Sequence, residues 1–191
     1  QAIISLIDIQ KDVLDKYPDM SLDNVLDSIT VRIKSIAAVH DLLSRDKSGR
    51  SIINIKNLIN VLVEFIDFTG RVKVEYDLDD IFIPYNKASS IALVVNELII
   101  NCLKHAFPED YSGKIYISCR RVDDMVGLIV SDNGVGVPHG INFSELQNMG
   151  LSIVESIINN ELKGKMEFIE QDGLTVKIKL PVKRLVIGLN Q

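Results

Sequence analysis

Cysteine is scarce in this sequence, and so are long apolar runs. Its two cysteines, Cys102 and Cys119, have no metal-ligand spacing and make no disulfide framework. No apolar run approaches the roughly 18 residues that a membrane-spanning helix needs, and no signal peptide is visible. These absences favour an intracellular chain. We therefore expect a cytoplasmic location without membrane contact by this segment, although a longer protein could be anchored upstream.

Positive charge is also in deficit. The net charge is −5 at pH 7, which argues against nucleic acid as a partner, because duplex binding needs a basic surface. A local basic pocket for a phosphorylated ligand is still compatible with this balance. Since 47% of the 191 residues are hydrophobic and 25% are charged, the chain can form a sizeable core, as one ordinary domain or two small ones.

The first 48 residues carry the pattern of an antiparallel helical hairpin. Residues 2–17 have apolar side chains at helical spacing, Pro18 interrupts them, and Ser21 offers a cap for a second helix that runs to about Ser44. The inward-facing positions of this second helix recur in alternating steps of four and three, as in a coiled coil: Leu22, Leu26, Ile29, Ile33, Ile36, His40 and Leu43. One hairpin cannot bury both of its apolar faces, so we expect a homodimer in which two copies pair through their N-terminal helices.

A polar segment with a glycine, Asp46–Arg50, separates this hairpin from residues 49–191, which form the second domain. There the periodicity alternates between that of helices and that of strands. The expected elements are a short strand at 52–53, a helix at 55–68 capped by Asn54, strands at 72–78 and 81–83, a helix at 86–106, a hairpin at 114–122 and 125–131, a helix at 151–162, a hairpin at 165–170 and 174–180, and an edge strand or tail at 184–189. The sequence therefore predicts the α+β class: a helical hairpin followed by an α/β sandwich with a mixed sheet.

The expected helix at 86–106 has a polar stripe. At about 100° per residue, Glu97, Asn101, Lys104 and His105 fall on one side, and apolar side chains fall on the opposite side. A solvated helix face would show this pattern, and so would a face that meets a polyphosphate and its metal ion. The helix alone does not decide between them.

Three glycine-containing segments lie further along the chain. Asp132-Asn133-Gly134-Val135-Gly136 follows an apolar strand, and alternate glycines allow a close approach to a ligand, although Asn-Gly is also a common hairpin turn. Gly150 begins an expected helix, where free N–H groups favour phosphate. Asp172-Gly173-Leu174-Thr175 opens the last expected strand, and Thr175 there is also explained by ordinary strand propensity.

Taken together and in this order, these segments resemble the nucleotide-binding domain of the ATPase superfamily that includes gyrase, mismatch-repair ATPases and sensor histidine kinases. The stretch from Asn96 to Phe107 resembles its N box, and the segments at 132–136 and 150–154 resemble its two glycine boxes. The ending Lys-His-Ala-Phe is similar to one class of two-component sensor histidine kinases, whose phosphoacceptor lies in a His-Arg-x-x-Asn-Asn box. A second-helix pattern at 32–43 extends the resemblance to the hairpin.

The resemblance implies ATP and Mg²⁺ as cofactors and gives roles to the polar stripe. Asn101 would ligate Mg²⁺ between the ATP phosphates, and Lys104 would neutralise phosphate charge. Glu97 would orient or deprotonate the group that attacks the γ-phosphate, or hold a metal-bound water. His105 would line the same wall. Asn96 lies about 100° away from the stripe, so we expect it to have a structural role.

The same resemblance assigns the glycine segments to the ATP. Asp132 would accept a hydrogen bond from the adenine amine, and Thr175 would assist through a water molecule. Gly134 and Gly136 would let the adenine fit. Gly150 and Leu151 would meet the phosphates, and the loop at 139–148 would close over the ligand.

The family's phosphoacceptor histidine is not in this chain. The sequence contains only His40, His105 and His139. His40 precedes an aspartate, as acceptor histidines do in other histidine kinases, but it lies on the apolar seam and matches the family's second-helix histidine. Either the acceptor lies upstream of this chain, which we expect, or the protein lacks it; we expect a response regulator as the downstream partner. Two alternatives remain: an anti-sigma-type serine kinase, and a non-catalytic phosphotransfer or scaffold module of the same fold.

Overall fold

The computed structural model describes residues 52–64, 70–108, 112–137 and 149–185, together with Thr30, Ile33 and Ala37. These three single residues are helical, as the pattern of the second N-terminal helix predicts. The rest of the hairpin, its pairing into a dimer and the loop at 139–148 lie outside the described residues. None of the described helices is long and apolar enough to cross a membrane.

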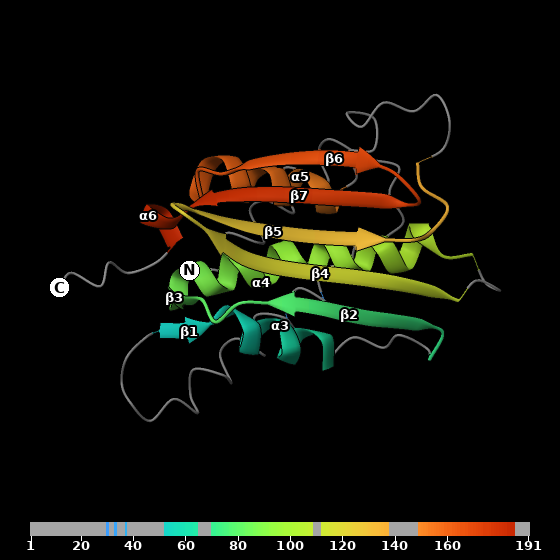
Figure 1. The fold of residues 1–191 in the computed structure, drawn as a ribbon, viewed down its shortest axis with the longest axis horizontal. Helices are drawn as coiled ribbons and strands as arrows, with labels where there is room; N and C mark the ends of the chain where they lie inside the picture. The colour runs from blue at the N-terminus through green and yellow to red at the C-terminus, as the bar shows by residue number, and fades with distance from the viewer. Residues whose placement is uncertain are drawn as a thin grey trace.

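The described residues from 52 onward are built on a five-stranded mixed sheet, as expected (Figure 1). Its spatial order is β2–β4–β5–β7–β6; β2 pairs with β4 in parallel, and the other pairs are antiparallel. The bounds of these strands are Val72–Leu78 (β2), Gly113–Val122 (β4), Met125–Asp132 (β5), Lys165–Glu170 (β6) and Leu174–Pro181 (β7).

One face of the sheet is covered by helices, and the other, toward the viewer in Figure 1, carries no helix of the described part of the chain. The helical layer consists of α3 (Ile55–Glu64), α4 (Tyr85–Asn101) and α5 (Met149–Ser156), with α4 in contact with both of the others. Strand side chains alternate between the two faces, so Val126, Leu128 and Val130 of β5 are buried under the helices. The core therefore lies between the sheet and α4.

A small second sheet fixes the start of α3 and α4. It pairs β1 (Ile52–Asn54) with β3 (Phe82–Pro84). Asn54 caps α3, as predicted, because its Oδ1 accepts a hydrogen bond from the backbone N–H of Lys56 at 2.9 Å. Pro84 immediately precedes α4, where its fixed φ and missing N–H do not interrupt the helix.

Two helical segments depart from the expected pattern. Two helices are followed directly by a π-helical turn: α4 continues into η1 (Cys102–Ala106), and α5 continues into η2 (Ile157–Glu161). The sequence left an edge strand or a tail open at 184–189; the two of these residues that the structure describes, 184 and 185, belong to a short helix, α6 (Val182–Leu185). Pro181 cannot donate to a sheet ladder, and the next N–H, that of Val182, donates to the Asp124 carbonyl at 2.8 Å instead. This directs the chain away from the sheet.

Candidate functional site

Asp132, the last residue of β5, is a buried carboxylate with only 6% of its surface exposed. Its Oδ1 accepts backbone hydrogen bonds from Gly134 at 2.9 Å and from Leu174 at 3.3 Å. Burial, and then the nearby Asp132 carboxylate, raise the pKa of the Cys102 thiol well above its usual value, so the thiol stays protonated and can donate to Asp132. Asp132 is thus held in one orientation by three separate segments.

The end of the α4–η1 helix lies directly against the glycine segment, residues 132–137. The N–H of Val135 donates to the carbonyl of Ala106 at 3.0 Å. A Cβ atom on Gly134 would lie 2.2 Å from the same carbonyl oxygen, so only glycine fits there. The structure therefore brings the end of the helix that carries the polar stripe into contact with the first glycine box, through Ala106.

A glycine in the β6–β7 turn also contacts Asp132. Gly173 has a φ of +118°, and a Cβ on it would lie 2.1 Å from the Asp132 carbonyl oxygen. The sequence reasoning noted Gly173 only as part of a turn, and gave no role to the Leu174 N–H. The Asp-Gly pair at a strand start was the available signal, because it marks a position where another backbone can approach.

The polar stripe runs from the core to the surface. Glu97 is only 6% exposed, Asn101 is half-buried, and Lys104 and His105 are exposed. A helix face turned to solvent does not bury a glutamate, so the solvated-face interpretation fails at Glu97. Asn96 is also buried, and its side-chain nitrogen has no hydrogen-bond partner among the described residues, so its structural role stays a prediction.

His105 is expected to be neutral at pH 7. Partial burial, and then the positive charge of Lys104, lower the pKa of His105 below its usual value. Because the folded state then binds a proton less readily than the unfolded state, stability should fall as the pH drops through about 6.5 toward the lower pKa of the folded protein. In His105→Gln we expect this pH-dependent loss to shrink by a few tenths of a kcal/mol, since solvent screens an exposed group. Urea unfolding between pH 5 and pH 7.5 measures the difference, and an NMR titration of His105 with a pKa above 6.5 would contradict it.

Thr175 does not join Asp132. Its Oγ1 lies 2.6 Å from Oγ of Ser131, its register partner on β5. Neighbouring residues of a strand point to opposite faces, so Ser131 and Thr175 lie on the face of the sheet opposite to the Asp132 carboxylate. The preceding residue, Leu174, makes the contact with Asp132 instead.

The remaining expected site residues lie in the glycine segment and in α5. Gly136 has a φ of +70°, which favours glycine. Gly150 and Leu151 lie in the first turn of α5, which packs beside α4. The second glycine box therefore lies in the first described turn of α5; its contact with phosphates stays a prediction.

The side chains at the end of the α4–η1 helix fit a cation that takes most of its ligands from phosphates and water. Among the residues that the structure describes, no group of three or more His, Cys, Asp or Glu side chains could hold a metal ion. Mg²⁺ is usually bound by one or two protein groups together with substrate phosphates and water. A single amide oxygen from Asn101 fits that pattern.

Comparison with known proteins adds family information to this geometry. Residues 86–184, more than half of the chain, match the family described as histidine kinase-, DNA gyrase B- and HSP90-like ATPases, and residues 1–67 match a histidine kinase family. The sensor histidine kinase PdtaS of Mycobacterium tuberculosis is 27% identical over 160 residues, which are 80% of this chain and 32% of that protein. The anti-sigma F factor of Bacillus subtilis is 28% identical over 85 residues, covering 39% of this chain and 58% of that protein. This chain therefore spans about a third of the length of PdtaS.

A solved structure shares the fold. The histidine kinase domain of the Erythrobacter litoralis EL346 blue-light-activated histidine kinase superposes with a TM-score of 0.74 at 23% identity, covering 95% of this chain and 85% of that one.

Proposed function

Because the chain belongs to the family of histidine kinase-, DNA gyrase B- and HSP90-like ATPases, we propose that it is the ATP-binding catalytic part of a two-component sensor histidine kinase. The histidine kinase match over residues 1–67 and the similarity to PdtaS support the kinase over the other branches of this family. In the proposed reaction, the γ-phosphoryl group of ATP passes to a histidine and then to an aspartate of a response regulator.

The observation that carries the proposal is the anchored, buried carboxylate of Asp132, which lies beside Cys102 of the helix that carries the polar stripe. A carboxylate oxygen accepts hydrogen bonds, so it would pair with the exocyclic amine of adenine and reject the carbonyl that guanine has there. Since Oδ1 already receives the two backbone donors, Oδ2 is the atom that we assign to the base. Buried and pre-oriented acceptors of this kind discriminate strongly between ligands.

The polar stripe would handle the phosphates. Phosphoryl transfer depends on positioning and charge stabilisation more than on covalent chemistry by the protein. In the proposed arrangement, Asn101 ligates Mg²⁺, which would supply charge neutralisation between the phosphates. Lys104, exposed at the helix end, would contact phosphate oxygens, and Glu97 would orient the attacking group from its buried position.

The phosphoacceptor is proposed to lie on another part of the protein. His105 belongs to the proposed ATP wall, and His40 and His139 lie outside the described residues. We do not assign the acceptor role to His40, because it occupies a seam position of the second helix. Dimer formation through the N-terminal helices and pairing with a response regulator complete the proposal.

The test is Mg·ATP binding without self-labelling. We expect calorimetry to show ATP binding that requires Mg²⁺ for full affinity, because the phosphates need charge neutralisation. After incubation with γ-labelled ATP, we expect no acid-labile, base-stable label on the chain. Absence of binding heat would exclude the proposed function, and a label that disappears in His40→Gln would move the acceptor to His40.

A serine kinase of the anti-sigma type is the second candidate, and the similarity to the anti-sigma F factor favours it. That similarity covers 39% of this chain, whereas the histidine kinase match extends through the N-terminal segment. Transfer of label to a serine of a partner protein, stable in acid, would favour this candidate over the first.

A further inference from the structure

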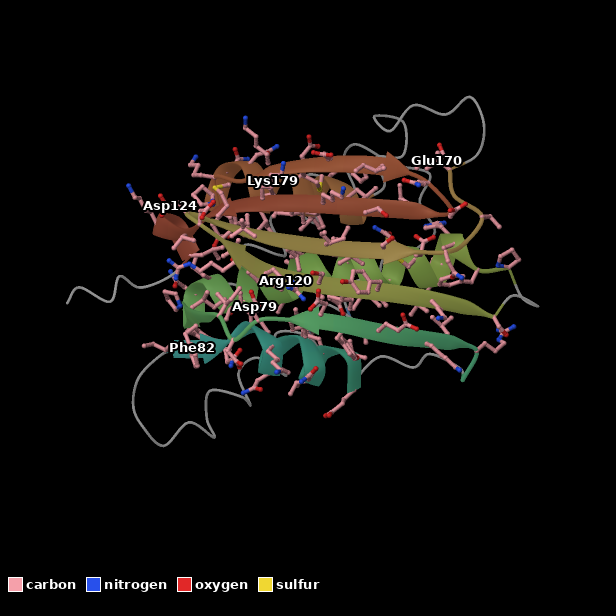
Figure 2. The ribbon with its side chains drawn as sticks, viewed as in Figure 1. Asp79, Phe82, Arg120, Asp124, Glu170 and Lys179 are labelled. Atoms are coloured by element: carbon pink, nitrogen blue, oxygen red, sulfur yellow. The ribbon has the colours of Figure 1, made fainter. Side chains whose placement is uncertain are left out.

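Glu170 lies at the end of β6, next to the segment that follows β5 (Figure 2). Its Oε1 accepts a hydrogen bond from the backbone N–H of Val137 at 3.2 Å. The same oxygen would lie 3.1 Å from a Cβ atom placed on Gly136, which is closer than most side chains tolerate. A carboxylate that accepts from a backbone N–H makes a charge-assisted hydrogen bond. We propose that Glu170 is a positioning residue that holds the glycine segment, residues 132–137, in its nucleotide-binding geometry.

The inference rests on the proposed ATP site and adds a residue that the sequence pattern did not indicate. After Asp132 the chain leaves the sheet, and every second backbone N–H then donates to a different part of the protein. The N–H of Asn133 donates to the carbonyl of Lys114 in β4, and the N–H of Val135 donates to Ala106 in η1. Glu170 supplies the third outside contact, at the far end of the segment.

Only one of these three hydrogen bonds can be removed directly by a substitution. The first two are accepted by backbone carbonyls, so no substitution deletes them directly. The third is accepted by a side chain, and its loss would free the end of the segment while Asp132 stays tied at the other end. The segment would then sample other conformations before ATP binds, and affinity would fall by the fraction of time spent outside the binding geometry.

The close approach also gives Gly136 a second role. Its φ of +70° and its missing side chain let the carboxylate reach the Val137 N–H. The sequence suggested that this glycine leaves room for the ligand. The structure shows that it also leaves room for Glu170.

Three variants test the role of Glu170. Glu170→Ala removes the acceptor, whereas Glu170→Gln keeps a side chain of the same length with an acceptor oxygen but without the charge. Glu167→Ala is the control, because it removes an exposed glutamate that lies three residues earlier on the same strand. Calorimetry with Mg·ATP is expected to show about tenfold weaker binding for Glu170→Ala. Glu170→Gln should stay within about twofold to threefold of wild type, and Glu167→Ala should be unchanged.

A second measurement needs no nucleotide. Amide hydrogen exchange at Val137 should become at least about fivefold faster in Glu170→Ala and remain near the wild-type rate in Glu170→Gln. The melting temperature of all three variants should match wild type, because the contact holds a surface segment and not the core. The inference would be overturned if Glu170→Ala showed both the wild-type exchange rate at Val137 and wild-type ATP affinity. It would also be overturned if Glu170→Gln bound ATP as weakly as Glu170→Ala. If wild type itself fails to bind ATP, the proposed function falls, while the exchange comparison still decides the role of Glu170.

Discussion

Asp132→Asn is expected to weaken Mg·ATP binding by about 100-fold while the protein remains folded. Asparagine has nearly the same shape as aspartate, and its carbonyl oxygen can still accept the backbone donors of Gly134 and Leu174, which fix Oδ1 in the wild type. Its amide nitrogen would then occupy the position of Oδ2 and point a donor at the adenine amine, which is also a donor. Two facing donors in a buried site leave both groups unsatisfied.

Calorimetry with ATP and GTP measures this effect directly. The amide of asparagine can donate a hydrogen bond to the guanine carbonyl, which a carboxylate cannot do, so the preference for ATP over GTP should narrow as ATP affinity falls. Asp172→Asn is the matched control: it removes an exposed charge nearby, and asparagine tolerates the positive φ of +50° at that position. If Asp132→Asn bound ATP with wild-type affinity, the Asp132 carboxylate would not be the group that hydrogen-bonds the adenine amine.

Local signals in the sequence were sufficient for most single elements. β2 and β6 begin and end at the predicted residues, and α4 begins one residue before the expected start, after Pro84. The Asn54 cap and the turn at Asp123, which has a φ of +52°, follow from side chains that act on their own backbone. Such signals act over a few residues, so they can be read without knowledge of the fold.

Placement across the sheet depends on distant segments and was harder to predict. β7 lies between β5 and β6, so the partner of Thr175 is Ser131, which the chain order does not reveal. A shift of one residue moves a side chain to the other face. The sequence placed Thr175 at the site by resemblance, and it gave no signal for the contact that Leu174 makes with Asp132.

The central helix shows a second limit. A period of about 100° per residue describes an α-helix, but η1 is a π-helical turn, which is wider and changes the direction of Lys104 and His105 relative to Asn101. Every side chain from Ile91 to Ile99 is buried, so polar and apolar sides of α4 do not correspond to exposed and buried sides. The burial of Glu97 therefore appears only in the structure.

Gly134→Ala should destabilise the protein by about 3 kcal/mol and also weaken ATP binding. The new methyl group would lie 2.2 Å from the carbonyl oxygen and 2.5 Å from the Cβ of Ala106, and both belong to a packed helix end. The glycine segment would have to move outward, which breaks the hydrogen bond from Val135 to Ala106 and shifts Asp132. For a protein of this size, the melting temperature should fall by roughly 6–12 °C.

Gly127→Ala is the control that separates this clash from the general effect of replacing a glycine. Gly127 also lies on β5, and the nearest atom to a Cβ placed there is 3.8 Å away, in ordinary contact. Alanine at such a site restricts the unfolded chain, so we expect unchanged or slightly higher stability, by about 0.5 kcal/mol, and wild-type ATP affinity. Thermal unfolding and calorimetry on both variants compare the two sites. Equal melting temperatures for Gly134→Ala and Gly127→Ala would mean that the helix end moves to accommodate the methyl group, so that the close contact between Gly134 and Ala106 does not limit stability.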